Sequence, residues 1–239
     1  MTEDFLLMVY KIPKFITIIP ARGGSKGIKK KNLIKICNKP LLYWSIIRSL
    51  KSKNISSTWV TSEDKEILEF SSNLGAKTII RPKKLSSDFA SSESAWLHAI
   101  NEISKNEYFD NVVGLQATSP IREFDDIDNA VKLFLKNKFD SLFSACEVTD
   151  HLLWRKHKNK YEPIIYPGGE RKPRQKIKKK YLENGSIYIF NKKKFKFYKK
   201  RLFEKTGIFE MLNYKSIQID EFEDIKFCES IMKNYHLNK

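Results

Sequence analysis

The chain has 239 residues, a length that fits one α/β domain with an appendage better than two full domains. Hydrophobic residues make up 41% and aromatic residues 13%, enough for a packed core, which excludes disorder over most of the length. The net charge of +17 comes mainly from 37 lysines set beside 8 arginines, and a bias toward AT-rich codons explains this excess as well as a functional basic surface does.

Strand and helix patterns then alternate along the chain from residue 15. The expected strands are short apolar or β-branched runs at 15–20, 57–62, 77–81, 111–116 and 140–146. The expected helices have apolar residues at helical spacing and cover 40–50, 63–75, 92–103 and 125–137. This alternation predicts a parallel sheet whose strand C-termini meet at one ligand-binding edge. The chemistry is therefore expected in the loops after residues 20, 61, 81, 116 and 146.

The alternation breaks between residues 147 and 182, where turns and charge runs show no clear period. This stretch is interpreted as an insertion with a function of its own. Strands are expected again at 186–190 and 216–219, and a closing helix at 223–235.

The cysteines and the N-terminus predict the compartment. Cys37, Cys146 and Cys228 are far apart and odd in number, which fits neither a disulfide framework nor a zinc site, and the four histidines form no ligand pattern. The apolar run at 5–10 is too short for a signal sequence or a membrane span. We therefore expect a cytoplasmic protein.

The first loop, PARGGSKGIKKKN (20–32), directly follows the first expected strand. It matches neither G-x-x-x-x-G-K-[ST] nor G-x-G-x-x-G. Its glycines allow backbone N–H groups to turn inward, Arg22 offers a planar fork of donors, and Lys26 and Lys31 offer point charges. This chemistry predicts a polyphosphate site, with a solvated basic loop as the alternative.

Four further blocks follow the first loop in a fixed order. They are LGAKTIIRPKKLSSDFASS (74–92), LQATSPIR (115–122), NGSIYI (184–189) and IDEFEDIKFCE (219–229). From about residue 15 to the end, the chain resembles the CMP-N-acylneuraminate synthetase, or acylneuraminate cytidylyltransferase, family. The resemblance implies a Rossmann-like three-layer α/β/α nucleotidyltransferase with a mostly parallel sheet and a small dimerisation insertion.

The same resemblance implies the reaction and the domain limits. The family transfers CMP from CTP to the anomeric hydroxyl of a nonulosonic acid, N-acetylneuraminate or a bacterial relative such as legionaminate, and releases pyrophosphate. Such products serve lipopolysaccharide or capsule biosynthesis. The implied cytidylyltransferase domain covers 14–239, with a dimerisation arm at 148–182 and an extension at 1–13. A homodimer and Mg²⁺ are implied with it.

Site residues follow from the resemblance position by position. The implied catalytic residues are Arg22, Lys31 and Asp220. The implied nucleotide contacts are Arg22, Gly23, Gly24, Ser25, Lys31, Asn32, Arg81, Ser87 and Ser91. The implied sugar-acid contacts are Gln116, Thr118, Ser119, Arg174, Asn184 and Tyr188, with Arg174 binding the substrate carboxylate in the partner's site. Three alternatives stay open: Ser92 as a helix cap, 118–120 as a turn, and Arg174 as part of a solvated basic run.

The expected metal ligand is Asp220, because Mg²⁺ prefers hard oxygen ligands. Many relatives have two acids spaced by one residue here, but Gln218 stands in place of the first, which argues against a two-metal arrangement. Asp224 is the weaker candidate, since a carboxylate at the start of the last helix favours the helix dipole. No general base emerges.

Other functions remain as alternatives. A transferase for pseudaminic acid or Kdo is the nearest, although relatives specific for pseudaminic acid often have Y-P-T-A-P where this chain has QATSP (116–120). A nucleic-acid-binding module would use the basic runs 171–181 and 191–201, the second of which also interleaves aromatic residues. The aromatic residues of the second run would otherwise pack a helix against the sheet. An inactive homologue is the third alternative, because of Gln218.

Overall fold

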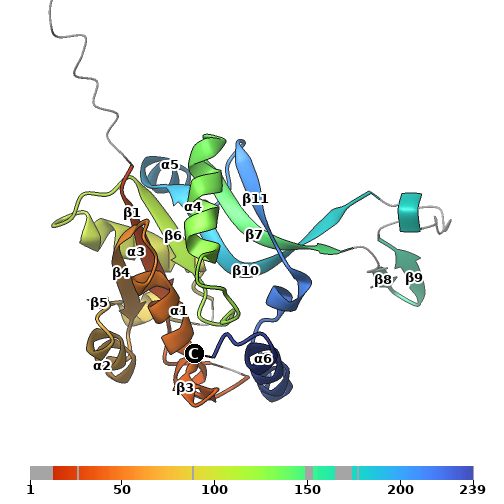
Figure 1. Ribbon diagram of the computed structural model, residues 1–239, viewed down its shortest axis with the longest axis horizontal. Coiled ribbons are helices and arrows are strands. Elements are labelled where there is room, and N and C mark those ends of the chain that lie inside the picture. The colour runs from red at the N-terminus through yellow and green to blue at the C-terminus, as the bar shows by residue number, and fades with distance from the viewer. Residues whose placement is uncertain are drawn as a thin grey trace, which may run out of the picture.

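The computed structural model describes residues 13–25, 27–87, 89–148, 153–164, 174–176 and 178–238. Its centre is a seven-stranded sheet with the order β11-β7-β10-β6-β1-β4-β5 (Figure 1). Neighbouring strands pair in parallel except at β10, which runs antiparallel to β6 and β7. The expected mostly parallel sheet is confirmed. The strands are β1 Phe15–Pro20, β4 Ile55–Ser62, β5 Lys77–Ile80, β6 Asn111–Leu115, β7 Ser141–Val148, β10 Lys180–Asn191 and β11 Thr206–Met211.

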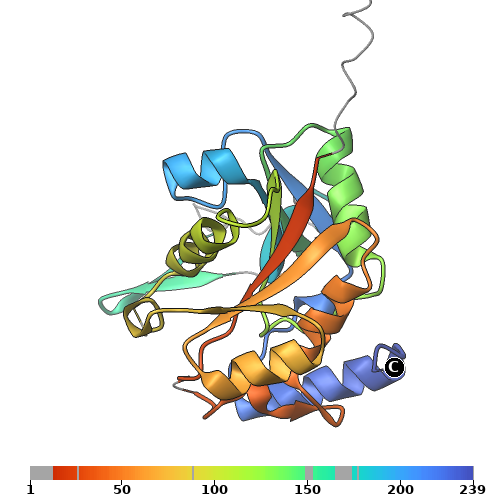
Figure 2. The ribbon, with the colours of Figure 1, turned by 90° about the vertical axis from the view of Figure 1, so that its left-hand side faces the viewer.

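Helices cover both faces of this sheet, which gives the three layers that the sequence predicted (Figure 2). One face packs against α1 Leu41–Leu50, α2 Lys65–Asn73 and α4 Asp126–Lys136. The other face packs against α3 Ser92–Ile103 and α5 Lys192–Tyr198. The continuous apolar run of β1 follows from this arrangement, because Phe15 and Ile19 enter one core while Ile16 and Ile18 enter the other.

A third apolar cluster lies outside the two faces of the sheet, among the segments that follow β1 and β6. There α6 Phe222–Asn234 packs near the hairpin β2 Lys35–Ile36 and β3 Lys39–Pro40. Trp44 of α1 joins this cluster and donates its indole N–H to the carbonyl of Ile36 at 3.1 Å. The cluster also contains Ile28 of the first loop, so the C-terminal helix lies at the edge of the sheet where β1 ends.

Two parts of the sequence-based assignment differ from the structure. The strand expected at 216–219 is wrong: a 3₁₀ helix, Asn213–Ser216, leads into irregular backbone, and the N–H of Ile219 donates to the carbonyl of Thr118 at 2.8 Å. Strand β11 was not expected. It contains Gly207, where a Cβ would lie 2.2 Å from the ring of Phe139, so a close contact and not a propensity selects the glycine.

The chain leaves the body between β7 and β10 (Figure 1). The described part of this arm contains an antiparallel hairpin, β8 Trp154–His157 paired with β9 Lys160–Pro163, and a 3₁₀ helix, Arg174–Lys176. Leu153, Trp154, Tyr161 and Ile164 are each more than half exposed on it. Apolar surface of this kind on a projecting hairpin is typical of an association surface.

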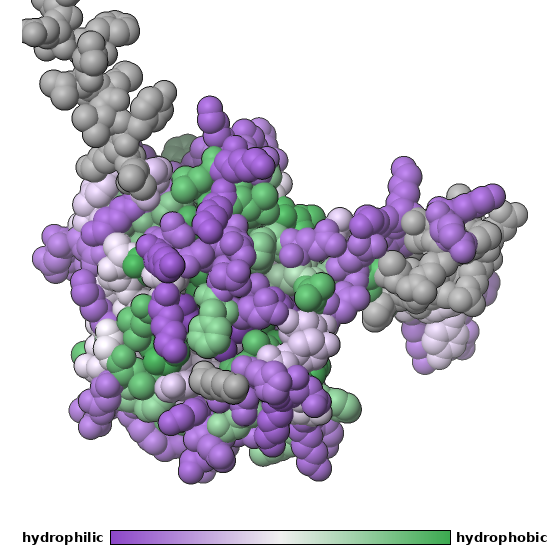
Figure 3. Space-filling model, in the orientation of Figure 1, coloured by the Kyte–Doolittle hydropathy of each residue, from purple (hydrophilic) through white to green (hydrophobic). Residues whose placement is uncertain are grey.

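On the face seen in Figure 3, hydrophilic side chains are spread over the body and the arm. In α5, Phe195 is buried against Phe190 and Trp96, as expected for a helix packed on the sheet, whereas Phe197 and Tyr198 are exposed. Within the described ranges, no helix combines the length and the apolar character that a membrane crossing requires.

Candidate active site

A cleft of about 540 Å³ lies at the C-terminal edge of the parallel strands. Its walls come from the loops after β1, β5 and β6 and from the segment before α6. The predicted site residues that line it are Arg22, Ser25, Lys31, Asn32, Arg81, Ser87, Ser91, Gln116, Thr118 and Asp220. The loop after β7 leads into the arm, and none of its described residues lines the cleft. Four sequence-distant segments thus meet where the topology predicted a ligand site.

Arg22 joins two walls of the cleft. Its guanidinium donates to the backbone carbonyl of Ser87, in the loop after β5, at 3.4 Å. The side-chain amide of Asn32, which is buried, donates to the carbonyl of Arg22 at 2.8 Å. Asn32 therefore fixes the backbone that carries Arg22, in addition to lining the cleft.

The glycines of the first loop serve close packing. The N–H of Gly23 donates to a carboxylate oxygen of Glu63 at 2.8 Å and so is engaged within the protein. A Cβ on Gly23 would lie 2.4 Å from the carboxylate of Asp64, and one on Gly27 would lie 2.7 Å from the carbonyl of Asp220. This differs from the expectation that the N–H of Gly23 points toward a bound phosphate. Gly24 has open space around it, and Lys26 lies outside the described residues.

Lys31 connects the first loop to the segment before α6. Its ammonium group donates to a carboxylate oxygen of Asp220 at 2.9 Å and to the carbonyl of Ile219 at 3.0 Å. The Lys31 side chain is 13% exposed, whereas that of Asp220 is 70% exposed. The cation is thus held at the wall, while most of the carboxylate faces the open cleft.

Arg81 is the most buried cation of the cleft, with a side chain only 4% exposed. Its Nε donates to the hydroxyl of Ser86 at 2.9 Å, and its terminal nitrogen donates to Glu63 at 3.3 Å. Burial lowers the pKa of Arg81 and outweighs the opposing effect of Glu63. A guanidinium remains protonated at neutral pH even so.

The serines on the same wall have distinct roles. Ser91 is the N-cap of α3, and its hydroxyl accepts the N–H of Ser94 at 3.2 Å. The capping considered for Ser92 therefore belongs to Ser91, because the helix starts at Ser92, one residue earlier than a cap at Ser92 requires. Ser87, Ser91 and Ser92 all line the cleft, so the residue that caps α3 also forms part of the cleft wall.

The loop after β6 is held by Arg122, which is fully buried. Its guanidinium donates to the hydroxyl of Ser45 at 2.9 Å, to the carbonyl of Gln116 at 2.9 Å and to the carbonyl of Ser186 at 2.7 Å. Burial lowers the pKa of Arg122 to about 9. These contacts fix where Gln116 and Thr118 project, and both side chains line the cleft.

Three residues predicted to contact the sugar acid lie behind the wall. Ser119 and Asn184 are buried. The hydroxyl of Ser119 donates to the backbone carbonyl of Asn184 at 3.1 Å, and the hydroxyl of Ser144 donates to the side-chain oxygen of Asn184 at 2.6 Å. Tyr188 is buried against Trp96 and donates its hydroxyl to Glu183. The structure thus gives them supporting positions, because their polar atoms bind protein groups and none lines the cleft.

Gly185 explains how β10 approaches the cleft. It has a φ of +66°, a conformation that favours glycine, and a Cβ there would lie 2.7 Å from the side-chain oxygen of Gln116. The same Cβ would lie 3.0 Å from the side-chain nitrogen of Gln218. Gln116 and Gln218 therefore meet over this glycine, beside the cleft.

Arg174 is the one predicted sugar contact on the arm. Its backbone begins the 3₁₀ helix Arg174–Lys176, and its side chain lies outside the described part of the structure. The expected contact with a substrate carboxylate therefore stays a prediction.

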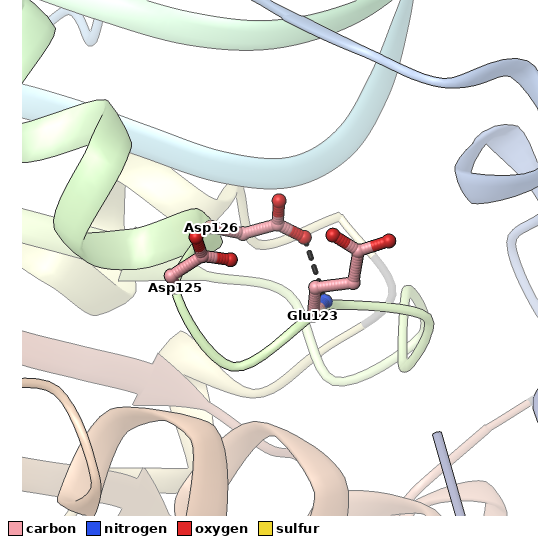
Figure 4. A group of neighbouring side chains, drawn as sticks. All are labelled: Glu123, Asp125 and Asp126. Atoms are coloured by element: carbon pink, nitrogen blue, oxygen red, sulfur yellow. Dashed lines mark hydrogen bonds between the residues drawn. The ribbon is translucent and has the colours of Figure 1, made fainter. Parts of the chain in front are cut away.

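Figure 4 shows an acidic group made by Glu123, Asp125 and Asp126, whose carboxylate oxygens lie within 4.8 Å of one another. Lys215 binds one member of this group, because its ammonium group donates to both oxygens of Asp126, at 2.8 and 3.0 Å, in a buried ion pair. Glu123 is partly exposed and Asp125 is exposed. These acids do not line the cleft, so Mg²⁺ for the cleft has to be sought at Asp220.

Asp224 starts the last helix, as its sequence position suggested. Its carboxylate accepts the N–H groups of Asp220 and Glu221, each at 2.8 Å, and completes a capping box at the start of α6. Asp220 and Glu221 both line the cleft. The oxygens of Asp220 fit a Mg²⁺ ion whose other ligands are phosphate oxygens and water.

Sequence reasoning missed Glu63, which was assigned only to the start of a helix. The signal was present, because Glu63 directly follows β4 at the ligand-binding edge. Its partners, Gly23 and Arg81, are 40 and 18 residues away, which the sequence pattern does not reveal.

Comparison with known proteins agrees with this arrangement. The profile of a family described as cytidylyltransferase matches residues 16–237. Pseudaminic acid cytidylyltransferase of Campylobacter jejuni is 32% identical over 228 residues, which span 93% of this chain and 98% of that protein. N-acylneuraminate cytidylyltransferase of Escherichia coli is 29% identical over 239 residues, which span 95% of this chain and 54% of that protein.

Among solved structures, CMP:2-keto-3-deoxy-manno-octonic acid synthetase in complex with CTP superposes with a TM-score of 0.71 at 16% identity. The match covers 93% of this chain and 99% of that one. A 4-diphosphocytidyl-2C-methyl-D-erythritol synthase from Anaerococcus prevotii gives a TM-score of 0.67 at 12% identity, over 92% and 96%. At these identities the likeness shows a shared nucleotidyltransferase fold.

Proposed function

Since the chain belongs to the cytidylyltransferase family, we propose that it transfers CMP from CTP to the anomeric hydroxyl of a nonulosonic acid and releases pyrophosphate. One observation carries this proposal: a single cleft gathers the cations Arg22, Lys31 and Arg81 from two separate loops beside the carboxylate of Asp220. A polyanionic nucleotide requires such a group of cations, since charge neutralisation lowers the barrier to attack on phosphorus.

In the proposed reaction, the anomeric oxygen attacks the α-phosphorus of CTP. A new P–O bond forms to the sugar, and the bond to the bridging oxygen breaks, so that pyrophosphate leaves with the electron pair. Negative charge develops on the leaving oxygen, and Arg22 and Lys31 stabilise it. None of the described histidines lines the cleft, and the proposal sends the proton of the hydroxyl to water.

Mg²⁺ is part of the proposal. Asp220 would hold it, and Glu221 is the other carboxylate of the cleft wall. When bound, the ion would neutralise charge on the phosphates. Gln218 supplies an amide where many relatives have an acid, which favours one ion held mostly by the nucleotide.

The sugar acid is proposed as N-acetylneuraminate or a bacterial relative such as legionaminate, on the basis of QATSP (116–120), which includes Gln116 and Thr118 of the cleft wall. Pseudaminic acid is the second candidate, since a pseudaminic acid cytidylyltransferase is 32% identical over nearly the whole chain. An assay that supplies CTP with each keto acid in turn and measures pyrophosphate release tests the proposal. The preferred acid should give the highest kcat/KM, and no release with any acid would overturn the function.

We also propose that the enzyme works as a homodimer in the cytoplasm. The exposed apolar side chains of the arm support association, and the thiols of Cys37, Cys146 and Cys228 are all free, which suits a reducing compartment. In such a dimer Arg174 would reach the partner's cleft and bind the carboxylate of the sugar acid.

A further inference from the structure

Glu63 lies behind the cleft and contacts two of its walls. One carboxylate oxygen accepts the N–H of Gly23 at 2.8 Å, in the first loop. The other accepts from the guanidinium of Arg81 at 3.3 Å, at the start of the loop after β5. The Glu63 side chain is only 16% exposed and does not line the cleft. One buried carboxylate thus spans the two loops that would hold the two ends of CTP.

The two contacts of Glu63 belong to a strong class of hydrogen bond. Both hydrogen bonds are charge-assisted, and a buried guanidinium such as that of Arg81 requires a compensating anion. Burial raises the pKa of Glu63, but hydrogen bonds from backbone N–H groups, Ser86 and Arg81 outweigh burial and hold it below its usual value. Glu63 is therefore ionised at neutral pH.

The neighbouring acids do not share this position. Asp64 caps α2 by accepting the N–H of Glu66 at 2.8 Å. Glu66 itself forms an exposed ion pair with Lys30. Among the described residues, Glu63 is the acid that connects the first loop to Arg81, and this gives it a role distinct from helix capping.

We propose that Glu63 is a positioning residue that holds the triphosphate loop (20–32) and the loop that starts at Arg81 in register, so that CTP is bound at both ends at once. The inference rests on the proposed use of CTP. Loss of Glu63 frees Arg81 to move toward the negative phosphates and releases Gly23, so the two loops bind the nucleotide independently.

The test compares Glu63→Ala and Glu63→Gln with Glu69→Gln, which removes an exposed carboxylate of α2. The expected result is a rise of about 10- to 100-fold in Kd for CTP by calorimetry and in KM for CTP, since two charge-assisted hydrogen bonds are lost. KM for the keto acid should stay unchanged, and kcat should change by less than about threefold. Glu69→Gln should bind CTP as the parent does.

A double-mutant cycle that combines Glu63→Gln with Arg81→Ala tests whether Glu63 affects CTP binding through Arg81 or independently of it. If Glu63 acts through Arg81, the double variant should bind CTP no more weakly than the weaker single variant. Glu63→Gln keeps the side-chain volume and decides the test where Glu63→Ala fails to fold. Equal losses in KM for both substrates, or additive losses in the cycle, would overturn the inference.

The two proposals fail in different ways. If the parent protein takes up no CTP in calorimetry, the proposed function itself fails. If the parent binds CTP and both Glu63 variants bind it equally well, the function stands and the role of Glu63 is wrong.

Discussion

At the sheet edge formed by β1, β4 and β5, polar side chains from distant segments bind one another below the surface, whereas the ion pairs of the arm lie in solvent. Glu63 and Arg81 are almost covered, but Arg155 and Glu162 on the hairpin β8–β9 are exposed around their 2.8 Å contact. Buried pairs of this kind fix geometry, and exposed pairs contribute little to stability. The described walls of the cleft are thus linked to one another by buried contacts, while the described part of the arm exposes apolar side chains.

The largest expected effect is at the cleft. Arg22→Ala should lower turnover by about a thousandfold, because it removes a charge that stabilises the leaving pyrophosphate. Pyrophosphate release at saturating CTP measures this. Lys105→Ala, which removes an exposed cation paired with Glu102, serves as the control and should leave turnover unchanged. Activity within a few-fold of the parent in Arg22→Ala would refute the catalytic role.

A second comparison separates two acids four residues apart. Asp220→Asn should lower turnover by about a hundredfold and raise the Mg²⁺ concentration needed for half-maximal rate, because an oxygen ligand in the cleft is lost. Asp224→Ala should instead lower the free energy of unfolding by about 1 kcal/mol, through loss of the helix cap, with a much smaller change in rate. The comparison breaks down if both variants show the same metal dependence.

The next largest effect is expected from a substitution on the arm. Arg174→Ala should raise KM for the sugar acid by about tenfold while KM for CTP changes little, because a bidentate contact to the substrate carboxylate is lost. The exposed Arg155→Ala on the same arm is the matched control. Light scattering on both variants shows whether the protein remains a dimer. A rise in both KM values together would speak against a role for Arg174 at the carboxylate.

The smallest effect concerns Glu107, whose oxygens accept from the hydroxyl of Ser57 at 2.7 Å and from Lys77 at 2.9 Å. Burial raises the pKa of Glu107, but the hydrogen bonds from Lys77 and Ser57 outweigh burial and hold it below 4.5. A depressed pKa contributes stability that is present above the ordinary carboxyl range and is lost as the pH falls through the folded-state value.

Glu107→Gln should therefore lower the free energy of unfolding at pH 7 by up to about 1 kcal/mol, since part of the pair is exposed. The difference from the parent should shrink as the pH falls below about 4.5. Urea unfolding at both pH values measures this, with the exposed Glu69→Gln as control. A difference that grows in acid would contradict the assignment.

The sequence predicted most of the sheet because its parallel strands are short runs rich in apolar or β-branched residues and are bounded by turn residues. The continuous apolar run FITIIP predicted a buried central strand, and both faces of β1 are covered in the structure. Strand β11 escaped notice because only one close contact, of Gly207 with Phe139, distinguishes it locally. The false strand at 216–219 has an alternating pattern, but its backbone bonds to the loop after β6.

For the site, local motifs and the family resemblance predicted which loops line the cleft: the glycines, cations and serines of the first loop and of 81–92, and the acid at Asp220, are readable without coordinates. Tertiary structure decided which side chains face the cleft. It placed Asn184 and Tyr188 behind the wall, and it turned the N–H of Gly23 toward Glu63. The physical reason is that hydrophobic period and turn chemistry are local, whereas a hydrogen bond between residues 40 positions apart exists only once the sheet has brought them together.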